Sequence, residues 1–423
     1  MTIAVLGLGV ALFSISGVLA SPRDDLASPP ALEATAPDNS TALLQQRIER
    51  LPGDYAAWSA LGTAYLDEAA ATANPAYYSK AEGAFERSLE IRPAENAAAV
   101  TGQAALAASR HDFRSALKLA RVSQRFNAYS AANQAVLVDA LVELGHYRRA
   151  EVELQRMVDL KPSVPASTRV SYYRELHGDI DGAREALQQA DAFASRTNDK
   201  AFIDRYLGEL AFSTGDLTSA LEHYDRGLAA APRNAALLAA RAKAQMAAGK
   251  LAEGLDDYRT STAMVPEPTV IADYAAALRA ANRTTEAAQQ DALTRTTYTL
   301  LRSSGSNVDL ELSSFEAASG NGTAAVAAAR REHRRRVSVH TEDALGWALH
   351  VAGEDEAALK HARAAERLSN TNAVFAYHRG MVEHSLGMKT AARQSLQRAL
   401  RLNPHFSLAG SAEARRTLQR LNR

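Results

Sequence analysis

The feature that most constrains the fold is an internal repeat of 34 residues. Identical residues recur at this spacing in several places: Gly215 and Gly249, Tyr224 and Tyr258, Pro232 and Pro266, and Gly353 and Gly387. Within a copy, a glycine is followed by a small residue five positions later and by a proline twelve positions after that, as in Gly387, Ala392 and Pro404. A fixed period of this length indicates a stack of helical hairpins rather than separate globular domains.

Each recurring residue has a physical role. The glycine allows the left-handed turn that ends the first helix, the small residue lets the second helix approach closely, and the proline ends that helix. Glycines in the middle of first helices would each cost about 1 kcal/mol in helix propensity. We therefore expect close helix contacts at Gly62, Gly208, Gly346 and Gly380. Alanine at about one residue in five also favours helix over strand.

The first copy of the repeat carries a recognisable pattern. It contains Trp58, Leu61, Gly62, Tyr65, Ala81, Phe85 and Pro93, in the order W-x2-L-G-x2-Y, A-x3-F, P. The chain thus resembles tetratricopeptide repeat proteins over about residues 40–423. The resemblance implies an all-α fold, a right-handed solenoid of about ten helix-turn-helix units with a C-terminal capping helix.

We expect five segments along the chain. Residues 1–20 are predicted to be a signal peptide or membrane anchor, because residues 2–20 carry no charge, and 21–39 a disordered linker rich in Pro, Ala and Ser. The repeats are predicted to form two blocks, 40–305 and 306–405, because the period slips where small polar residues cluster; 406–423 would be the capping helix. These predictions place the array outside the cytoplasm, secreted or membrane-anchored, and the Cys-free, alanine-rich chain suggests a bacterial envelope protein.

Charge and cysteine content exclude several classes of function. Lys+Arg and Asp+Glu are both 48, so no net field favours nucleic acid, and no nucleic-acid partner is expected. The absence of cysteine excludes disulfides, thiolate catalysis and cysteine-ligated metals. A G-x-G-x-x-A match at 320–325 follows no predicted strand, and an S-x-x-K match at 115–118 lacks its companion motifs. We therefore predict no enzyme activity and no cofactor.

A candidate partner-binding site lies near the C-terminus. The family resemblance implies that first helices line a concave groove, with the residues 3, 6, 10 and 13 positions before the turn glycine pointing into it. The first three of these positions hold His350, Trp347 and Asp343 in one unit and His384, Met381 and Tyr377 in the next. Aromatic residues dominate binding energy at interfaces, so we predict that a protein or peptide binds here. The alternative is that Trp347 and Met381 only fill space against the capping helix.

A basic run precedes this site: Arg330, Arg331, Arg334, Arg335 and Arg336. Arginines near a helix C-terminus are favourable to the helix dipole, so a solvated outer face explains the run. The alternative is a docking patch for an acidic protein or anionic lipid.

Three functions remain open at this point. The first is a non-enzymatic scaffold outside the cytoplasm that binds a protein or peptide partner, assembling an envelope or secreted complex. The second is a structural spacer on the cell surface. The third is a metal-handling protein that uses His350 and His384 with His378 or His340, since imidazole binds transition metals. No sequence motif supports that site, and no metal ligands are predicted.

Overall fold

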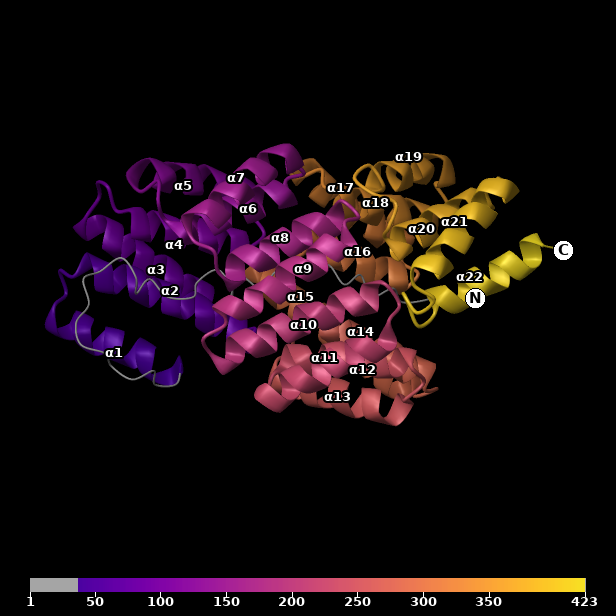
Figure 1. Cartoon of the computed structure of the whole chain (residues 1–423), viewed down its shortest axis with the longest axis horizontal. Helices are drawn as coiled ribbons and strands as arrows, with labels where there is room; N and C mark the ends of the chain where they lie inside the picture. The colour runs from indigo at the N-terminus through magenta and orange to yellow at the C-terminus, as the bar shows by residue number, and fades with distance from the viewer. Residues whose placement is uncertain (1–36, 423) are drawn as a thin grey trace. The chain divides into compact units, whose positions relative to one another are not determined.

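The computed structural model describes residues 37–422, and every regular element in this range is a helix (Figure 1). The predicted signal peptide or anchor and residues 21–36 of the predicted linker lie outside the described residues. Residues 37–39 were expected in the linker but begin the first helix, where Pro37 is tolerated because an N-terminal N–H has no partner inside the helix. None of the helices in residues 37–422 combines the length and apolarity needed to span a bilayer.

The helices are arranged as consecutive pairs, as the repeat predicts. The first helix is α1 (Pro37–Arg50). Ten pairs follow: α2 (Tyr55–Thr72) and α3 (Ala76–Ile91), α4 (Ala97–Ser109) and α5 (Phe113–Phe126), α6 (Ala131–Glu143) and α7 (Tyr147–Leu160), α8 (Val164–Leu176) and α9 (Ile180–Ala190), α10 (Thr197–Ser213) and α11 (Leu217–Ala230), α12 (Ala235–Ala247) and α13 (Leu251–Met264), α14 (Pro268–Ala280) and α15 (Thr284–Ser303), α16 (Asp309–Ala318) and α17 (Gly322–Arg335), α18 (Val339–Val351) and α19 (Asp355–Ala365), and α20 (Ala373–Ser385) and α21 (Lys389–Leu402). A short 3-10 helix, η3 (Asp191–Phe193), extends α9, and α22 (Gly410–Leu421) ends the chain. The predicted all-α repeat solenoid is confirmed.

The turn residues behave as predicted. The five turn glycines adopt positive φ angles between 72° and 82°: Gly145, Gly215, Gly249, Gly353 and Gly387. Each repeat proline lies two residues beyond the end of a second helix, as Pro404 lies beyond Leu402 of α21. The left-handed turn and the helix stop therefore recur in the same order along the array.

Phe85 explains why glycine occupies the middle of two first helices. A Cβ atom built on Gly62 of α2 would lie 2.5 Å from the Phe85 ring, and one built on Gly102 of α4 would lie 2.1 Å from it. The fully buried Phe85 ring thus fills space that two glycines leave open in successive pairs. This close packing offsets the free energy that the low helix propensity of glycine costs at these positions.

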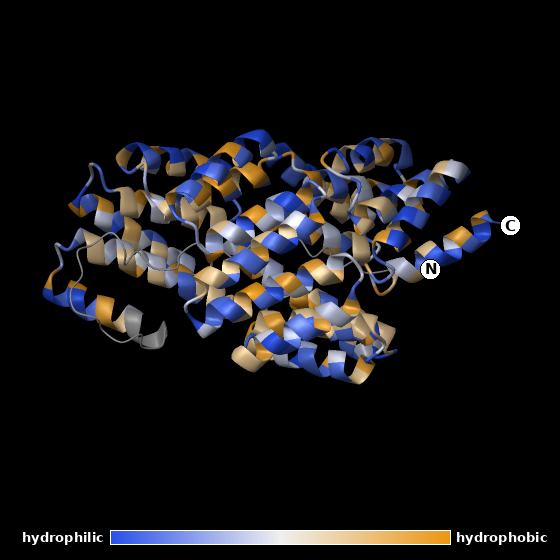
Figure 2. Cartoon of the chain, in the orientation of Figure 1, coloured by the Kyte–Doolittle hydropathy of each residue, from blue (hydrophilic) through white to orange (hydrophobic). Residues whose placement is uncertain are grey.

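Hydrophobic residues line the inward side of each helix. Figure 2 shows hydrophobic and hydrophilic residues alternating along individual helices. In α21, for example, Ala392, Leu396 and Ala399 are buried while Gln394 and Gln397 are exposed. Such one-sided burial is what stabilises a helix in a stacked array.

The described residues divide into two compact units, 37–161 with 300–307 and 162–299 with 308–422. Residues 300–307 belong to the first unit because Asn307 bonds twice to the end of α4. Its N–H donates to the Arg110 carbonyl at 2.8 Å, and its carbonyl lies 2.8 Å from His111 Nδ1. This division differs from the predicted blocks 40–305 and 306–405.

The second unit contains contacts between residues far apart in sequence. The Tyr172 hydroxyl of α8 lies 3.1 Å from His340 Nε2 of α18, across 168 residues. The Asn403 side chain after α21 bonds to the Phe212 carbonyl at the end of α10. Within this unit, the early pairs therefore contact the late ones.

Candidate functional site

Two helices, α18 and α20, carry the six residues predicted to bind a partner. The Ser338 hydroxyl caps α18 by accepting the Thr341 N–H at 3.3 Å, and Asn372 caps α20 by accepting the Phe375 N–H at 3.1 Å. Gly353 and Gly387 follow the two helices with positive φ. Local sequence thus starts and ends both helices at equivalent points, so His350 and His384 occupy matching positions.

The predicted site contains a buried aromatic layer. Trp347 is 7% exposed and stacks on His378, with ring centroids 4.1 Å apart and an interplanar angle of 16°. Tyr377 lies 5.7 Å from Trp347 and 5.1 Å from Phe406, between centroids, and burial raises its pKa. These aromatic side chains pack against their neighbours. Partner binding through Trp347 and its alternative, space filling against the capping helix, both stay predictions.

A buried carboxylate orients the stacked histidine. His378 Nδ1 donates to Asp343 Oδ1 at 2.8 Å and lies 3.0 Å from Oδ2, and both side chains are 1% exposed. Asp343 therefore holds the ring that Trp347 covers. Sequence reasoning missed this role because His378 lies on a different helix and 35 residues further along the chain.

The other three predicted residues, His350, Met381 and His384, are partly exposed. His350 Nδ1 lies 2.5 Å from Asp355 Oδ1, and its ring centroid lies 5.0 Å from that of Trp347. Burial lowers the pKa of His350, and this effect outweighs the opposite effect of Asp355; His378 and His384 lower it further. The accessible part of the predicted site therefore consists of His350, whose lowered pKa favours the neutral imidazole, the thioether of Met381 and the imidazole of His384.

The basic run is partly a solvated face, since three of its five arginines are exposed. Arg336 is buried and bonds to the buried Glu332. Arg331 and Arg335 both reach Asp309 of α16 at 2.6 Å. Arg330 pairs with Glu354 at 3.1 Å. Most of the charge predicted to form a patch is thus paired with carboxylates, although Arg336 is the only one of these four arginines whose side chain is itself buried.

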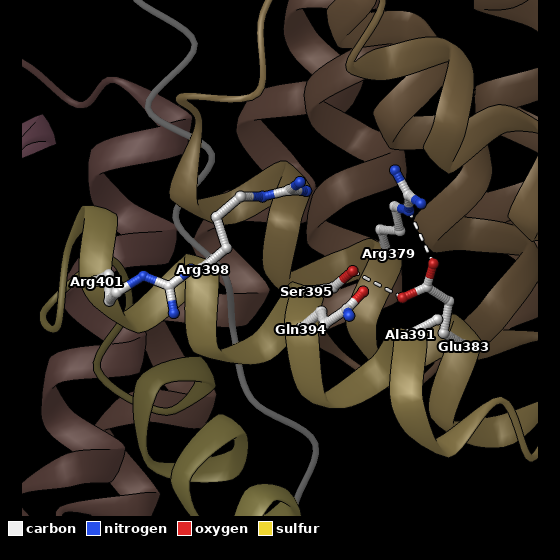
Figure 3. Close-up of a pocket in the computed structure, with 7 residues that line it drawn as sticks. All are labelled: Arg379, Glu383, Ala391, Gln394, Ser395, Arg398 and Arg401. Carbon is white, nitrogen blue, oxygen red and sulfur yellow. Dashed lines mark hydrogen bonds and ion pairs between the residues drawn. The ribbon is translucent and has the colours of Figure 1, made fainter.

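A pocket of about 200 Å³ lies between α20 and α21 (Figure 3). Figure 3 shows Arg379 and Ser395 directed at the buried Glu383, with bond distances of 2.8 and 2.7 Å. Arg398 and Arg401 also line it. Arg379 and Arg398 share a second carboxylate, Glu366, so the pocket wall is a network of paired charges.

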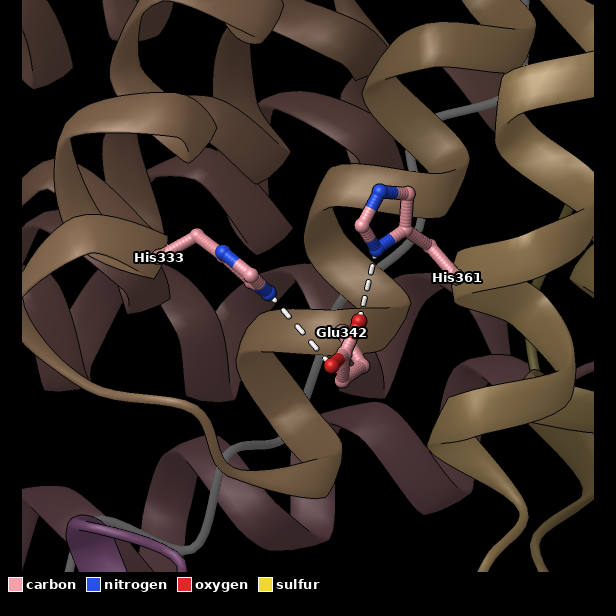
Figure 4. Close-up of side chains that lie close together, drawn as sticks. All are labelled: His333, Glu342 and His361. Atoms are coloured by element: carbon pink, nitrogen blue, oxygen red, sulfur yellow. Dashed lines mark hydrogen bonds and ion pairs between the residues drawn. The ribbon is translucent and has the colours of Figure 1, made fainter.

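A second cluster, which sequence reasoning did not find, joins three helices (Figure 4). It comprises His333 of α17, Glu342 of α18 and His361 of α19. His361 Nδ1 lies 2.6 Å from Glu342 Oε2, and His333 Nε2 lies 3.4 Å from Oε1. Burial raises the pKa of Glu342, but the two histidines outweigh it and the net pKa is lowered.

The sequence signal that could have revealed this cluster is the number of residues that separates facing positions on the two helices of a pair. Glu342 and His361 are 19 residues apart, as are Asp204 and His223, which also interact. Within residues 37–422, this cluster is the one group of histidine and carboxylate side chains that lie close enough together to hold a metal ion. It includes none of the histidines considered as metal ligands from the sequence: His340, His350, His378 and His384. His340 is half-buried, and desolvation lowers its pKa to about 4.

Comparison with known proteins supports the repeat type. Residues 373–406, which comprise α20, α21 and the following turn, match the tetratricopeptide repeat family. No curated protein shows significant similarity to the chain.

Solved helical structures are also similar. A thermophilic TPR protein from Thermus thermophilus is 22% identical, with a TM-score of 0.38, over 50% of this chain and 100% of that one. The human IFIT1 dimer with PPP-AAAA is 16% identical, with a TM-score of 0.47, over 78% of both chains. A tetratricopeptide repeat protein from Parabacteroides merdae is 16% identical, with a TM-score of 0.37, over 62% of this chain and 100% of that one.

Proposed function

We propose that the chain is a non-enzymatic scaffold that binds a protein or peptide partner on the face formed by α18 and α20. The observation that carries this proposal is the matched placement of His350 and His384, partly exposed, one repeat apart. The match of residues 373–406 to the tetratricopeptide repeat supports it, because helical solenoids present extended binding surfaces.

The buried layer beneath this face favours binding. Trp347 is held by stacking on His378, which is held in turn by Asp343. A partner that contacts His350, Met381 or His384 would meet side chains backed by fixed neighbours. Preorganisation of this kind lowers the entropy lost on association.

Capture from an extract of the source cells tests the partner site. We expect a protein recovered by the wild-type chain to be lost from the His384→Ala and Met381→Ala double variant. Gln397→Ala, on the exposed side of α21, is the matched control and should retain the protein. Equal recovery by the double variant, at an unchanged melting temperature, would contradict the site and favour a structural spacer.

We also propose that the scaffold acts outside the cytoplasm, in an envelope or secreted complex. The support is the uncharged run at residues 2–20. Addition of protease to intact cells should digest a periplasmic or surface-exposed array once the outer barrier is opened, while a cytoplasmic marker survives. Protection of the array together with the marker would contradict this location.

A further inference from the structure

We propose that His333, Glu342 and His361 form a binding site for a divalent transition metal ion, with Zn²⁺ as the ion that fits best. Two imidazoles and one carboxylate are a ligand set that zinc accepts, and three protein ligands leave a fourth position for water. The proposal does not depend on the partner-binding face, which uses other residues.

The three side chains converge from three helices. Figure 4 shows His333 and His361 approaching Glu342 from opposite sides. One ligand atom from each residue lies within 4.8 Å of the other two, and the histidine rings are nearly perpendicular at 82°. Ligand atoms around tetrahedral zinc lie roughly 3.3 Å apart, given bonds of about 2.0–2.1 Å. The ligand atoms that lie furthest apart would therefore have to move closer together when zinc binds.

An unsatisfied nitrogen supplies independent support. His333 Nε2 is shielded from solvent and makes no hydrogen bond of acceptable geometry in the described structure. Its contact with Glu342 Oε1, at 3.4 Å, is an approach between opposite partial charges. Buried polar atoms of this kind are costly when unpaired, and a metal ion between Nε2 and Oε1 would satisfy both.

The surrounding charges determine which ion fits. The cluster adjoins the arginines of the basic run, and most of these are paired with Asp309, Glu332 or Glu354. With only one carboxylate in the cluster and arginines nearby, ions held mainly by oxygen and charge, such as Ca²⁺ and Mg²⁺, are disfavoured. Ions that bond strongly to imidazole are favoured.

A bound ion would join two neighbouring repeats. His333 lies in the last turn of α17, whereas Glu342 and His361 belong to the next pair, α18 and α19. Ligation would fix the junction between these pairs, where α17 packs on α18. The ion is thus expected to stabilise the array.

Zinc titration of the untagged full chain, first stripped with a chelator, tests the proposal. We expect about one equivalent of Zn²⁺ to bind and the melting temperature to rise by a few degrees, because the ion binds the native state. His361→Ala should weaken binding by more than about 10-fold, the loss that even outer-shell changes cause. His223→Ala is the matched control, because His223 also faces a carboxylate, Asp204, 19 residues earlier. Binding that is unchanged in His361→Ala, or absent from the wild type, would overturn the proposal.

A second variant, read by cobalt spectroscopy, tests the site even if His361→Ala fails to fold. Co²⁺ in place of Zn²⁺ should give visible d–d bands in the wild type. His361→Cys retains a ligand and should add a thiolate-to-cobalt charge-transfer band in the near ultraviolet. A Co²⁺ spectrum identical in the wild type and His361→Cys would show that His361 is not a ligand and would refute the site.

Discussion

The Asn403 side chain donates a hydrogen bond to the carbonyl oxygen of Phe212 at 2.8 Å, although 191 residues separate them. The same side chain accepts the His405 N–H at 2.7 Å and so closes the turn after α21. Repeats in a solenoid ordinarily contact only their neighbours. One buried amide therefore joins a local turn to a helix end several repeats away.

Asn403→Asp separates these two roles. The carboxylate can still accept the His405 N–H, but it cannot donate to the Phe212 carbonyl. We expect the free energy of unfolding to fall by about 1–3 kcal/mol, the cost of an unsatisfied buried group, as measured by urea denaturation. Asn127→Asp is the control, because Asn127 accepts the Tyr129 N–H in an equivalent turn after α5. Equal losses in the two variants would show that the long-range bond contributes nothing.

Gly62→Ala and Gly83→Ala should have opposite effects. A methyl group on Gly62 would meet the buried Phe85 ring at 2.5 Å, so we expect a net loss of about 1–3 kcal/mol through overpacking. Gly83, in α3, has nothing within 4 Å of the added methyl, so Ala should stabilise by about 0.5–1 kcal/mol. Thermal unfolding of both variants checks this, and a stabilising Gly62→Ala would contradict the close approach.

Arg336 and Arg330, two arginines of the basic run, should contribute very differently to the free energy of unfolding. Arg336→Met removes the buried guanidinium that pairs with the buried Glu332, and we expect a loss of up to about 3–5 kcal/mol in the free energy of unfolding. Arg330→Ala removes an exposed pair with Glu354 and should cost less than about 1 kcal/mol. Denaturant titration distinguishes the two. Adding Glu332→Met to Arg336→Met should recover much of the loss, and failure to do so would point to a cause other than the broken pair of Arg336 and Glu332.

Glu175→Gln should change how stability depends on pH. Burial, with a smaller contribution from nearby Glu209, raises the pKa of Glu175 from 4.5 to about 7, and a hydrogen bond with Ser213 opposes this rise. The folded state therefore holds a proton that the unfolded state releases, so stability falls as pH rises from about 4.5 through 7.

The glutamine variant has no such proton to lose. It should be more stable than the wild type at pH 8, and the difference should shrink towards pH 4. Urea unfolding at both pH values measures it, with the exposed Glu185→Gln on α9 as control. A difference that is the same at both pH values would argue against the raised pKa.

Local features of the fold could be predicted from the sequence because they depend on few residues. A turn at Gly353 requires a backbone conformation that glycine adopts freely, and Pro404 cannot continue α21. The close contact at Gly62 also follows from one unfavourable residue in a helix. These requirements are fixed within one hairpin, so a repeat pattern is sufficient to place them.

Features that depend on helix phase or on distant repeats could not be predicted. The pairing of Glu342 with His361 depends on how α19 is rotated about its own axis relative to α18. Their separation of 19 residues is informative only when it is compared with the equal separation of Asp204 and His223, which also interact. The repeat pattern places Trp347 in the groove, but the pattern does not predict that it stacks on His378 of the next pair and is 7% exposed. The bond from Asn403 to Phe212 depends on small rotations added over many repeats.

The contact between Tyr172 and His340 has a consequence for synthesis of the chain. The ribosome releases α8 long before it makes α18, so the contact between the Tyr172 hydroxyl and His340 forms only late in synthesis. The hydrogen bond that the Phe212 carbonyl accepts forms later still, once Asn403 has been made. Nascent chains stalled before residue 340 should therefore expose these surfaces to chaperones and proteases, and those released after residue 405 should not.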